Sequence, residues 1–343
     1  MVGMTGFRTS IIRRIAFLAF ALITYTVAGQ EPLKIMPLGN SITRGSMCVN
    51  GNIYYSCVLN ADSNAIGYRY RLYNLLNAAG YNFDFVGKHS YGYAIFDDPD
   101  NSGFDGIRSW QLADIMETGT SSSYNGQETP GPYLNYYPAD IILLHIGTND
   151  VLAGSTSVAD VSRILDAIDT YENVSGKPVI VFLATILSEK NYPCDTHSGT
   201  IAFNTNLAAM AQARIQNGDH IVLVDMECGA GLDYYNDLVD QVHPDEAGYS
   251  KMGDMWFQAI NNFNSAPLIS SIPEQVTWRG TSFDTLNLDN YVTDVENTAQ
   301  QMTWSVSPAD PQYFNVVINS DRQVIVTPKD TAWSGSESLQ FNV

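Results

Sequence analysis

The sequence predicts an α/β fold in which helices cover both faces of a parallel sheet, followed by a smaller all-β region. Between residues 34 and 263, apolar runs of strand length alternate with longer stretches of helical spacing. This alternation is typical of parallel sheets, whose strands are buried on both faces. After residue 264, short runs that alternate apolar and polar residues follow one another without helical stretches, which indicates strands alone.

The expected elements follow in order along the chain. Strands are expected at residues 34–39, 82–87, 141–146, 179–186 and 221–226. Helices are expected at residues 67–79, with Gly80 as a stop signal, and near 158–172, 201–215 and 246–263. Right-handed crossovers bring the carboxyl ends of such strands to one edge of the sheet, which is where open α/β sheets place their chemistry.

The N-terminus has the character of a targeting segment. Three arginines precede an apolar stretch over residues 15–27, and the small residues Ala28 and Gly29 follow it. A basic start, an apolar stretch too short to span a bilayer comfortably and a small-residue exit predict a secretory signal peptide over residues 1–29. An uncleaved membrane anchor is the alternative. We therefore expect a secreted protein, with cell-surface association as a further option.

Length and charge limit the organisation and the partners of the chain. Its 343 residues, 45% of them hydrophobic, can form one sizeable domain and a smaller one. We expect the α/β domain at residues 30–264, a linker at 265–273 and a partial β-sandwich at 274–343. The formal net charge of −19 repels phosphate backbones and anionic membranes, which argues against nucleic-acid binding.

The four cysteines are too few to form the framework of the fold, but an exported chain can oxidise them. Cys48 and Cys57 flank a short polar segment, and their small separation predicts one bridge. Cys194 and Cys228 each follow an apolar run, and neighbouring parallel strands would bring them together as a second bridge. Zinc is the rival use for four cysteines, but neither pair has Cys-x2-Cys spacing.

Five residues with catalytic potential fall on loops beyond the predicted strands. Ser41 follows the first strand, and Asn149 follows the third. Gly106 lies in a glycine-containing segment between the second and third strands, and Asp240 precedes His243 by three residues after the fifth strand. Because these loops are expected above one sheet edge, the five residues are expected to converge there.

These residue types fit nucleophilic ester hydrolysis. A neutral His243 imidazole can take the proton of the Ser41 hydroxyl and return it to the leaving alcohol. Asp240 would hold the other ring nitrogen and stabilise the imidazolium. The tetrahedral oxyanion needs donors, and the candidates are the backbone amides of Ser41 and Gly106 with the side-chain amide of Asn149. The alternative for Asp240 is a solvated loop acid, which would leave a Ser-His dyad.

With these residues in place, the sequence resembles the SGNH, or GDSL-type, hydrolase superfamily over residues 34–263. The family's four marker residues are matched in order by Ser41, Gly106, Asn149 and His243. Further segments are most similar to carbohydrate esterases of the acetyl xylan esterase type: Pro37-Leu38-Gly39-Asn40-Ser41-Ile42-Thr43, Gly67-Tyr68-Arg69, Phe83-Asp84-Phe85-Val86-Gly87 and Leu143-Leu144-His145-Ile146-Gly147-Thr148-Asn149-Asp150. Asn40 stands where the family has aspartate; since that side chain mainly stabilises a turn as an acceptor, asparagine can replace it.

The resemblance implies a flavodoxin-like three-layer α/β/α sandwich and a secreted serine esterase without a cofactor or metal. Its substrate would be acetylated polysaccharide such as xylan, or another small acyl ester. Two alternatives stay open. One is a lysophospholipase or thioesterase, because a fold does not choose among acyl groups. The other is a non-catalytic carbohydrate-binding or adhesive surface protein.

Two polar residues close to these segments have plain structural interpretations. His145 lies inside an apolar strand and is expected to be a satisfied core residue or to support the site from behind. Asp150 can be explained as a cap of the helix that follows it.

The tail resembles the cadherin-like or immunoglobulin-like repeats of bacterial surface and secreted proteins. The matching segments are Ile272-Pro273-Glu274-Gln275, Asp289-Asn290-Tyr291-Val292-Thr293-Asp294 and Trp333-Ser334-Gly335-Ser336-Glu337. The region is shorter than a whole sandwich of roughly 100 residues, so we expect a partial domain that could attach the protein to a cell surface or polysaccharide. Asp289, Asp294 and Glu296 could contribute to a calcium site, but solvated loop acids are the favoured interpretation.

Overall fold

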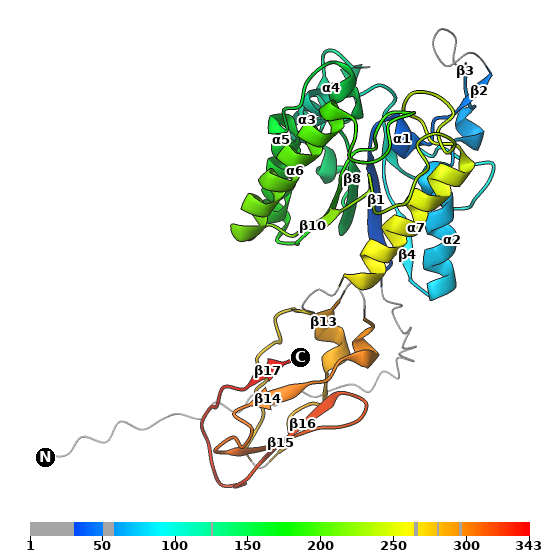
Figure 1. The fold of residues 1–343 in the computed structure, drawn as a ribbon. Helices are drawn as coiled ribbons and strands as arrows, with labels where there is room; N and C mark the ends of the chain where they lie inside the picture. The colour runs from blue at the N-terminus through cyan, green and yellow to red at the C-terminus, as the bar shows by residue number, and fades with distance from the viewer. Residues whose placement is uncertain (1–30, 51–57, 125, 264–266, 280, 295–296) are drawn as a thin grey trace, which may run out of the picture. The chain divides into compact units, whose positions relative to one another are not determined.

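The computed structural model describes residues 31–50, 58–124, 126–263, 267–279, 281–294 and 297–343 (Figure 1). The predicted signal peptide at residues 1–29 lies outside the described residues, as do the first two residues of the predicted linker. Across the described ranges, no helix is long and apolar enough to cross a membrane.

A parallel sheet forms the centre of the α/β part and confirms the predicted fold class. Its strands are β1 (Leu33–Gly39), β4 (Phe83–Phe85), β8 (Ile141–His145), β9 (Ile180–Ala184) and β10 (Ile221–Val224). They lie in the order β10-β9-β8-β1-β4, and the two-residue β5 (Ser102–Gly103) also pairs with β1. All five expected strands are present, each near its predicted position, and β1 lies inside the sheet.

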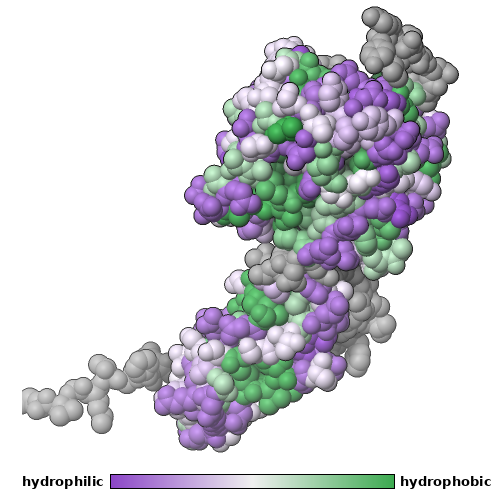
Figure 2. Space-filling view, viewed as in Figure 1, coloured by the Kyte–Doolittle hydropathy of each residue, from purple (hydrophilic) through white to green (hydrophobic). Residues whose placement is uncertain are grey.

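Helices cover both faces of this sheet, as Figure 1 shows. On one face lie α2 (Gly67–Ala79) and α7 (Glu246–Asn262), which pack against each other. On the other lie α3 (Ser109–Thr118), α5 (Ala159–Ser175) and α6 (Ser198–Gln216). In α2, Tyr68, Leu72 and Leu76 are spaced by four residues, so one stripe of the helix is fully buried. The outward surface of α7 is largely hydrophilic (Figure 2).

Several elements were not expected. No helix was expected after Gly106, but the chain there continues into α3. Ser41 and Asn149 lie in short helices, α1 (Ser41–Arg44) and α4 (Thr148–Leu152). The remaining short elements are β2 (Cys48–Asn50) paired with β3 (Val58–Leu59), β6 (Thr120–Ser121) paired with β7 (Gly126–Gln127), η1 (Asp62–Asn64) and η2 (Tyr133–Asn135).

The C-terminal region consists of small antiparallel sheets. These are β11 (Leu268–Ile269) with β13 (Val292–Thr293), β12 (Leu286–Asn287) with β16 (Gln323–Pro328) and β15 (Phe314–Ile318), and β14 (Ser305–Ser307) with β17 (Gln340–Asn342). Two 3-10 turns, η3 (Leu288–Tyr291) and η4 (Ala299–Gln301), complete the region. Its own core contains Leu288, Val292, Trp304 and Val324. The domain boundaries and the repeat family of this region stay predictions.

The acids considered for a calcium site have other partners or lie outside the described residues. Asp289 accepts hydrogen bonds from two nitrogens of Arg322, at 2.6 and 2.9 Å. Asp294 accepts from the backbone and side chain of Asn297, whereas Glu296 lies outside the described residues. No cluster of three or more metal-ligating side chains occurs in the described part of the chain.

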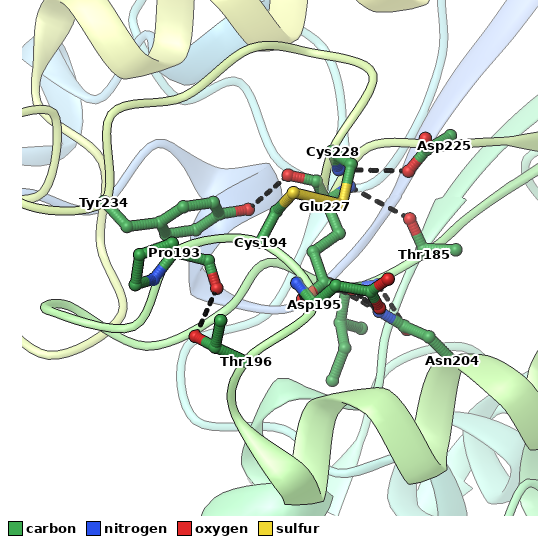
Figure 3. Close-up of a disulfide and its surroundings, with 11 residues drawn as sticks. Thr185, Pro193, Cys194, Asp195, Thr196, Asn204, Asp225, Glu227, Cys228 and Tyr234 are labelled. Carbon is green, nitrogen blue, oxygen red and sulfur yellow. Dashed lines mark hydrogen bonds between the residues drawn. A yellow bond between two sulfur atoms is a disulfide. The ribbon is translucent and has the colours of Figure 1, made fainter.

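A disulfide joins Cys194 and Cys228, with Cα atoms 5.2 Å apart (Figure 3). Cys194 lies between β9 and α6, and Cys228 follows β10, so the bridge connects loops that leave two neighbouring strands. This confirms the pairing predicted from strand adjacency. The other predicted bridge, from Cys48 to Cys57, includes a residue outside the described ranges and stays a prediction.

Candidate active site

The turn that carries Ser41 is built by its sequence neighbours. Asn40 caps α1, because its Oδ1 accepts the Ile42 N–H at 3.0 Å. Asparagine therefore serves in the acceptor role proposed for this position. Gly39 must lack a side chain, since a Cβ there would lie 2.1 Å from the backbone oxygen of His145. Ser41 is thus held at the end of the buried strand β1, and only 7% of it is exposed.

The structure brings the predicted serine, histidine and aspartate together. His243 Nε2 lies 2.9 Å from Ser41 Oγ, and His243 Nδ1 lies 2.8 Å from Asp240 Oδ2. Asp240 also accepts the backbone N–H groups of Val242 and His243 through Oδ1, at 3.0 and 2.8 Å. The carboxylate therefore shapes its own loop as well as contacting the imidazole, and it is not a solvated loop acid: only 6% of Asp240 is exposed.

The contacts of Asp240 also affect its ionisation. Burial alone would raise the pKa of Asp240. The hydrogen bond and charge of His243 and the two backbone N–H donors lower it by more, so the pKa of Asp240 lies below its ordinary value. The carboxylate is ionised at neutral pH. Cys48 Sγ also lies 3.0 Å from Asp240 Oδ2, which places the β2 strand beside the loop that carries Asp240 and His243.

Gly106 lies in the loop between β5 and α3, close to the Ser41 turn. The loop leaves β5 beside β1, where the Phe104 N–H donates to the Gly39 oxygen at 3.0 Å. Gly106 adopts φ +69°, a conformation that favours glycine, and it is exposed. Gly106 therefore lies on an exposed loop beside the Ser41 turn, the position expected of a candidate oxyanion donor.

Asn149 lies at the second position of α4 and contacts the same loop. Its Nδ2 donates to the Ile107 oxygen at 2.9 Å. An amide nitrogen carries two hydrogens, so one donor remains for a ligand. Together with the N–H of Ser41, which lies in the first turn of α1 and has no acceptor within that helix, these groups can surround a developing negative charge.

Sequence reasoning missed a polar network that holds the Gly106 loop from the Ser41 side. Asp105 accepts the Ser46 hydroxyl at 2.6 Å and pairs with Arg44 Nε at 3.1 Å. Arg44 is 4% exposed, also pairs with Asp62, and lies over the ring of Tyr91. The only sequence signal was the short spacing of Arg44 and Ser46 from Ser41, because their partners lie far along the chain.

Two expectations about neighbouring polar residues need correction. Asp150 does not cap the helix that follows it; its carboxylate instead accepts hydrogen bonds from Ser109 at the start of α3. His145 is fully buried, yet neither ring nitrogen has a hydrogen-bond partner among the described residues, so it is not the satisfied histidine expected. Burial lowers the pKa of His145 to about 4, which keeps the ring neutral at physiological pH.

A shallow depression lies between α4 and the loops that follow β9 and β10. It borders α4 and the His243 loop, and its walls include Thr148, Val151, Leu152, Ile186, Leu187 and Val242. Thr148 and Val242 are the chain neighbours of Asn149 and His243. Ser41 is not part of this lining, and the depression is too tight to hold even a water molecule, so no ligand is assigned to it.

The family model described as GDSL-like Lipase/Acylhydrolase matches residues 35–256. A curated relative, the Multidomain esterase of Ruminococcus flavefaciens, is 30% identical over 255 residues, which is 68% of this chain and 29% of the relative. The chain thus spans less than a third of that relative's length.

Similar solved structures include a family 3 carbohydrate esterase from Clostridium thermocellum, at 25% identity and a TM-score of 0.49, covering 66% of this chain and 94% of that one. A family 3 carbohydrate esterase from Talaromyces cellulolyticus is 20% identical, with a TM-score of 0.47 and coverage of 66% and 95%. On the family match over residues 35–256, the chain belongs to the GDSL-like lipase and acylhydrolase family and is an esterase-type enzyme.

Proposed function

We propose that this protein is a secreted serine esterase that removes small acyl groups, above all acetyl, from xylan or a related polysaccharide. One observation carries the catalytic part of the proposal. Ser41 Oγ, His243 and Asp240 form a continuous hydrogen-bonded chain with contacts of 2.9 and 2.8 Å. This is the arrangement that activates a serine hydroxyl for attack on an ester.

The ionised Asp240 decides which imidazole nitrogen acts as the base. An ionised carboxylate only accepts hydrogen bonds, so Nδ1 of His243 must carry the proton in the 2.8 Å contact. Nε2 then presents a lone pair to the Ser41 hydroxyl. The tautomer required of a general base is thereby set by the loop that Asp240 organises.

Acylation and deacylation follow from this geometry. Nε2 takes the proton as Ser41 Oγ forms a bond to the carbonyl carbon, and the carbonyl oxygen becomes an oxyanion. The backbone amides of Ser41 and Gly106 and the Asn149 amide donate to that oxygen. The imidazolium then protonates the leaving sugar oxygen as its bond to carbon breaks. Water, deprotonated by His243, hydrolyses the acyl-serine, releasing the carboxylic acid and restoring the hydroxyl.

The choice of acetyl as the acyl group and of carbohydrate as its carrier rests on the resemblance of the motif segments to acetyl xylan esterases. Attachment through the C-terminal β region remains part of the proposal.

Secretion is supported by the sequence of residues 1–29 and by the bridge between Cys194 and Cys228. Disulfides persist in oxidising compartments and are rare in the cytosol. N-terminal sequencing of the protein from the culture medium tests this part. Retention of residues 1–29 on a cell-bound protein would favour the membrane-anchor alternative instead.

The catalytic proposal is tested with Ser41→Ala and p-nitrophenyl acetate. The variant is expected to lose nearly all turnover, because it retains no nucleophile. Ser250→Ala is the matched control, since the Ser250 hydroxyl is exposed and only donates to Glu246 of its own helix. Equal turnover of Ser41→Ala and the wild type would refute the serine mechanism, and an inactive wild type would favour the non-catalytic surface protein.

Substrate choice is tested separately. Acetyl to decanoyl p-nitrophenyl esters are compared first, followed by acetate release from acetylated xylan. We expect kcat/KM to be highest for acetyl and to fall with chain length. A preference for long acyl chains would overturn the acetyl assignment and favour the lysophospholipase or thioesterase alternative.

A further inference from the structure

We propose that Asp150 is a positioning residue for the oxyanion hole, because its carboxylate ties the Asn149 turn to the loop that carries Gly106. The inference rests on the proposed ester hydrolysis and adds a role that the catalytic residues do not include. Asp150 does not touch the reacting atoms itself. It acts through two of the groups that would stabilise the oxyanion.

The contact joins two elements that are distant in the sequence. Asp150 Oδ2 accepts the backbone N–H of Ser109 at 3.0 Å, and Oδ1 accepts the Ser109 hydroxyl at 2.8 Å. The two residues are 5% and 1% exposed. Asp150 belongs to α4, whereas Ser109 begins α3, so both carboxylate oxygens bind an element other than their own.

A second contact reinforces the first. Asn149 Nδ2 donates to the Ile107 oxygen at 2.9 Å, so consecutive residues of α4 hold Ile107 and Ser109. Gly106 precedes both. No heavy atom outside its chain neighbours lies within 4 Å of the place where a Cβ would be, so side-chain packing does not fix this residue. The Gly106 amide must therefore be oriented by the contacts of the residues on either side of it. On one side Asp105 binds Ser46 and Arg44, and on the other Asp150 binds the buried Ser109.

The protein has a carboxylate at Asp150 although burial disfavours the charged form of this side chain. Burial raises the pKa of Asp150, and the Ser109 N–H and hydroxyl oppose that shift. An exposed side chain from the same segment is enough to cap the start of a helix. A buried carboxylate from another element costs more desolvation than such a cap. The contact therefore serves to couple α4 to the loop before α3 rather than only to begin a helix.

A double-mutant cycle between Asp150→Ala and Asn149→Ala tests the proposal with p-nitrophenyl acetate at saturating concentrations. Asn149→Ala is expected to lower kcat by about 10²-fold, the usual effect of losing one oxyanion donor. Asp150→Ala alone is expected to lower kcat by about 10- to 100-fold, with KM changed less than about threefold. In the Asn149→Ala background, the same change should lower kcat by a smaller factor, about 3- to 10-fold, because only the Gly106 amide is then left to be misplaced.

Two further variants separate positioning from stability. Asp150→Asn should keep kcat within about threefold of the wild type, because the amide oxygen can accept the Ser109 N–H while the amide nitrogen donates to the hydroxyl. Asp140→Ala is the matched control. Asp140 precedes the other end of β8 and likewise accepts a backbone N–H, that of Lys34, at 2.9 Å. Its removal should lower the melting temperature and leave kcat unchanged.

Equal fold-losses from Asp150→Ala in the presence and absence of Asn149 would overturn the positioning role. A loss of kcat in Asp140→Ala as large as in Asp150→Ala would do the same, since it would trace both effects to stability. If Asp150→Ala fails to fold, Ser109→Ala replaces it in the cycle and removes one of the two contacts. An inactive wild type would count against the proposed function instead.

Discussion

Replacing Asp240 with asparagine changes the contacts of Oδ2 and leaves the two backbone hydrogen bonds of Oδ1 in place. The wild-type carboxylate accepts the backbone N–H groups of Val242 and His243 through Oδ1 and the His243 ring through Oδ2. In Asp240→Asn, the amide oxygen can keep both backbone contacts. The amide nitrogen then faces Nδ1 as a donor, so Nδ1 must become the acceptor and the proton moves to Nε2. Nε2 can no longer accept the proton of Ser41.

The expected size of the effect follows from that tautomer change. A comparable substitution in another Ser-His-Asp triad left the geometry intact and lowered kcat by about 10⁴-fold. At about 1.4 kcal/mol for each tenfold change, this corresponds to about 5 kcal/mol of transition-state stabilisation. Since the two backbone contacts remain, the free energy of unfolding should fall by only about 1–2 kcal/mol.

The assay compares kcat for p-nitrophenyl acetate with thermal unfolding of the same preparations. Asp245→Asn is the matched control, because it removes the same charge two residues after His243. Asp245 caps α7 by accepting the Gly248 N–H at 2.8 Å, and asparagine caps equally well. This control should keep wild-type kcat.

The pH dependence of stability provides a second measurement. The pKa of Asp240 is lowered in the folded state, so the carboxylate stabilises the wild type above the ordinary aspartate pKa. That stabilisation is lost as the pH falls through the lowered folded-state pKa. The melting temperatures of the wild type and Asp240→Asn should therefore differ at pH 7 and converge in acid. Turnover of Asp240→Asn within about tenfold of the wild type would refute the tautomer reasoning and leave a Ser-His dyad.

Three further predictions concern stability. Burial raises the pKa of Asp98 to about 6 although the Phe85 N–H opposes the shift, so its ionisation destabilises the fold as pH rises from about 4 through 6. Asp98→Asn should therefore raise the melting temperature at pH 7.5 but not at pH 4. Arg69 is fully buried and donates to five backbone oxygens, so Arg69→Met should lower the urea-measured unfolding free energy by about 3 kcal/mol or more. Replacing Cys194 and Cys228 by alanine should lower it by about 2–4 kcal/mol.

Each of these predictions has a contrary outcome. An equal rise in the melting temperature of Asp98→Asn at pH 7.5 and at pH 4 would mean that the charge of Asp98 is not the cause. Wild-type stability of Arg69→Met would show that other donors replace the guanidinium at the five carbonyls. An unchanged urea midpoint after loss of both cysteines would show that the loops after β9 and β10 are held without the bridge.

The sequence by itself was enough for the layers of the α/β fold and for the order of the candidate site residues. Apolar periodicity reports local burial, so the five strands and α2, α5, α6 and α7 could be predicted from short windows. The general rules of parallel sheets then placed Ser41, Asn149 and His243 at one edge. The same adjacency of β9 and β10 made the pairing of Cys194 with Cys228 predictable, without any knowledge of the loops.

Only the tertiary structure decided how the polar loops at that edge hold one another. Asp150 and Ser109 are 41 residues apart, and Ser46 and Asp105 are 59 apart, so neither contact leaves a mark in the local pattern. The helix α3 was not predicted, and the N–H and hydroxyl of its first residue are bound by the distant Asp150 carboxylate. Hydrogen bonds between polar residues have no periodicity, and they depend on the final positions of backbone groups. Which polar residues join the site is therefore settled by packing, after the apolar pattern has set the fold.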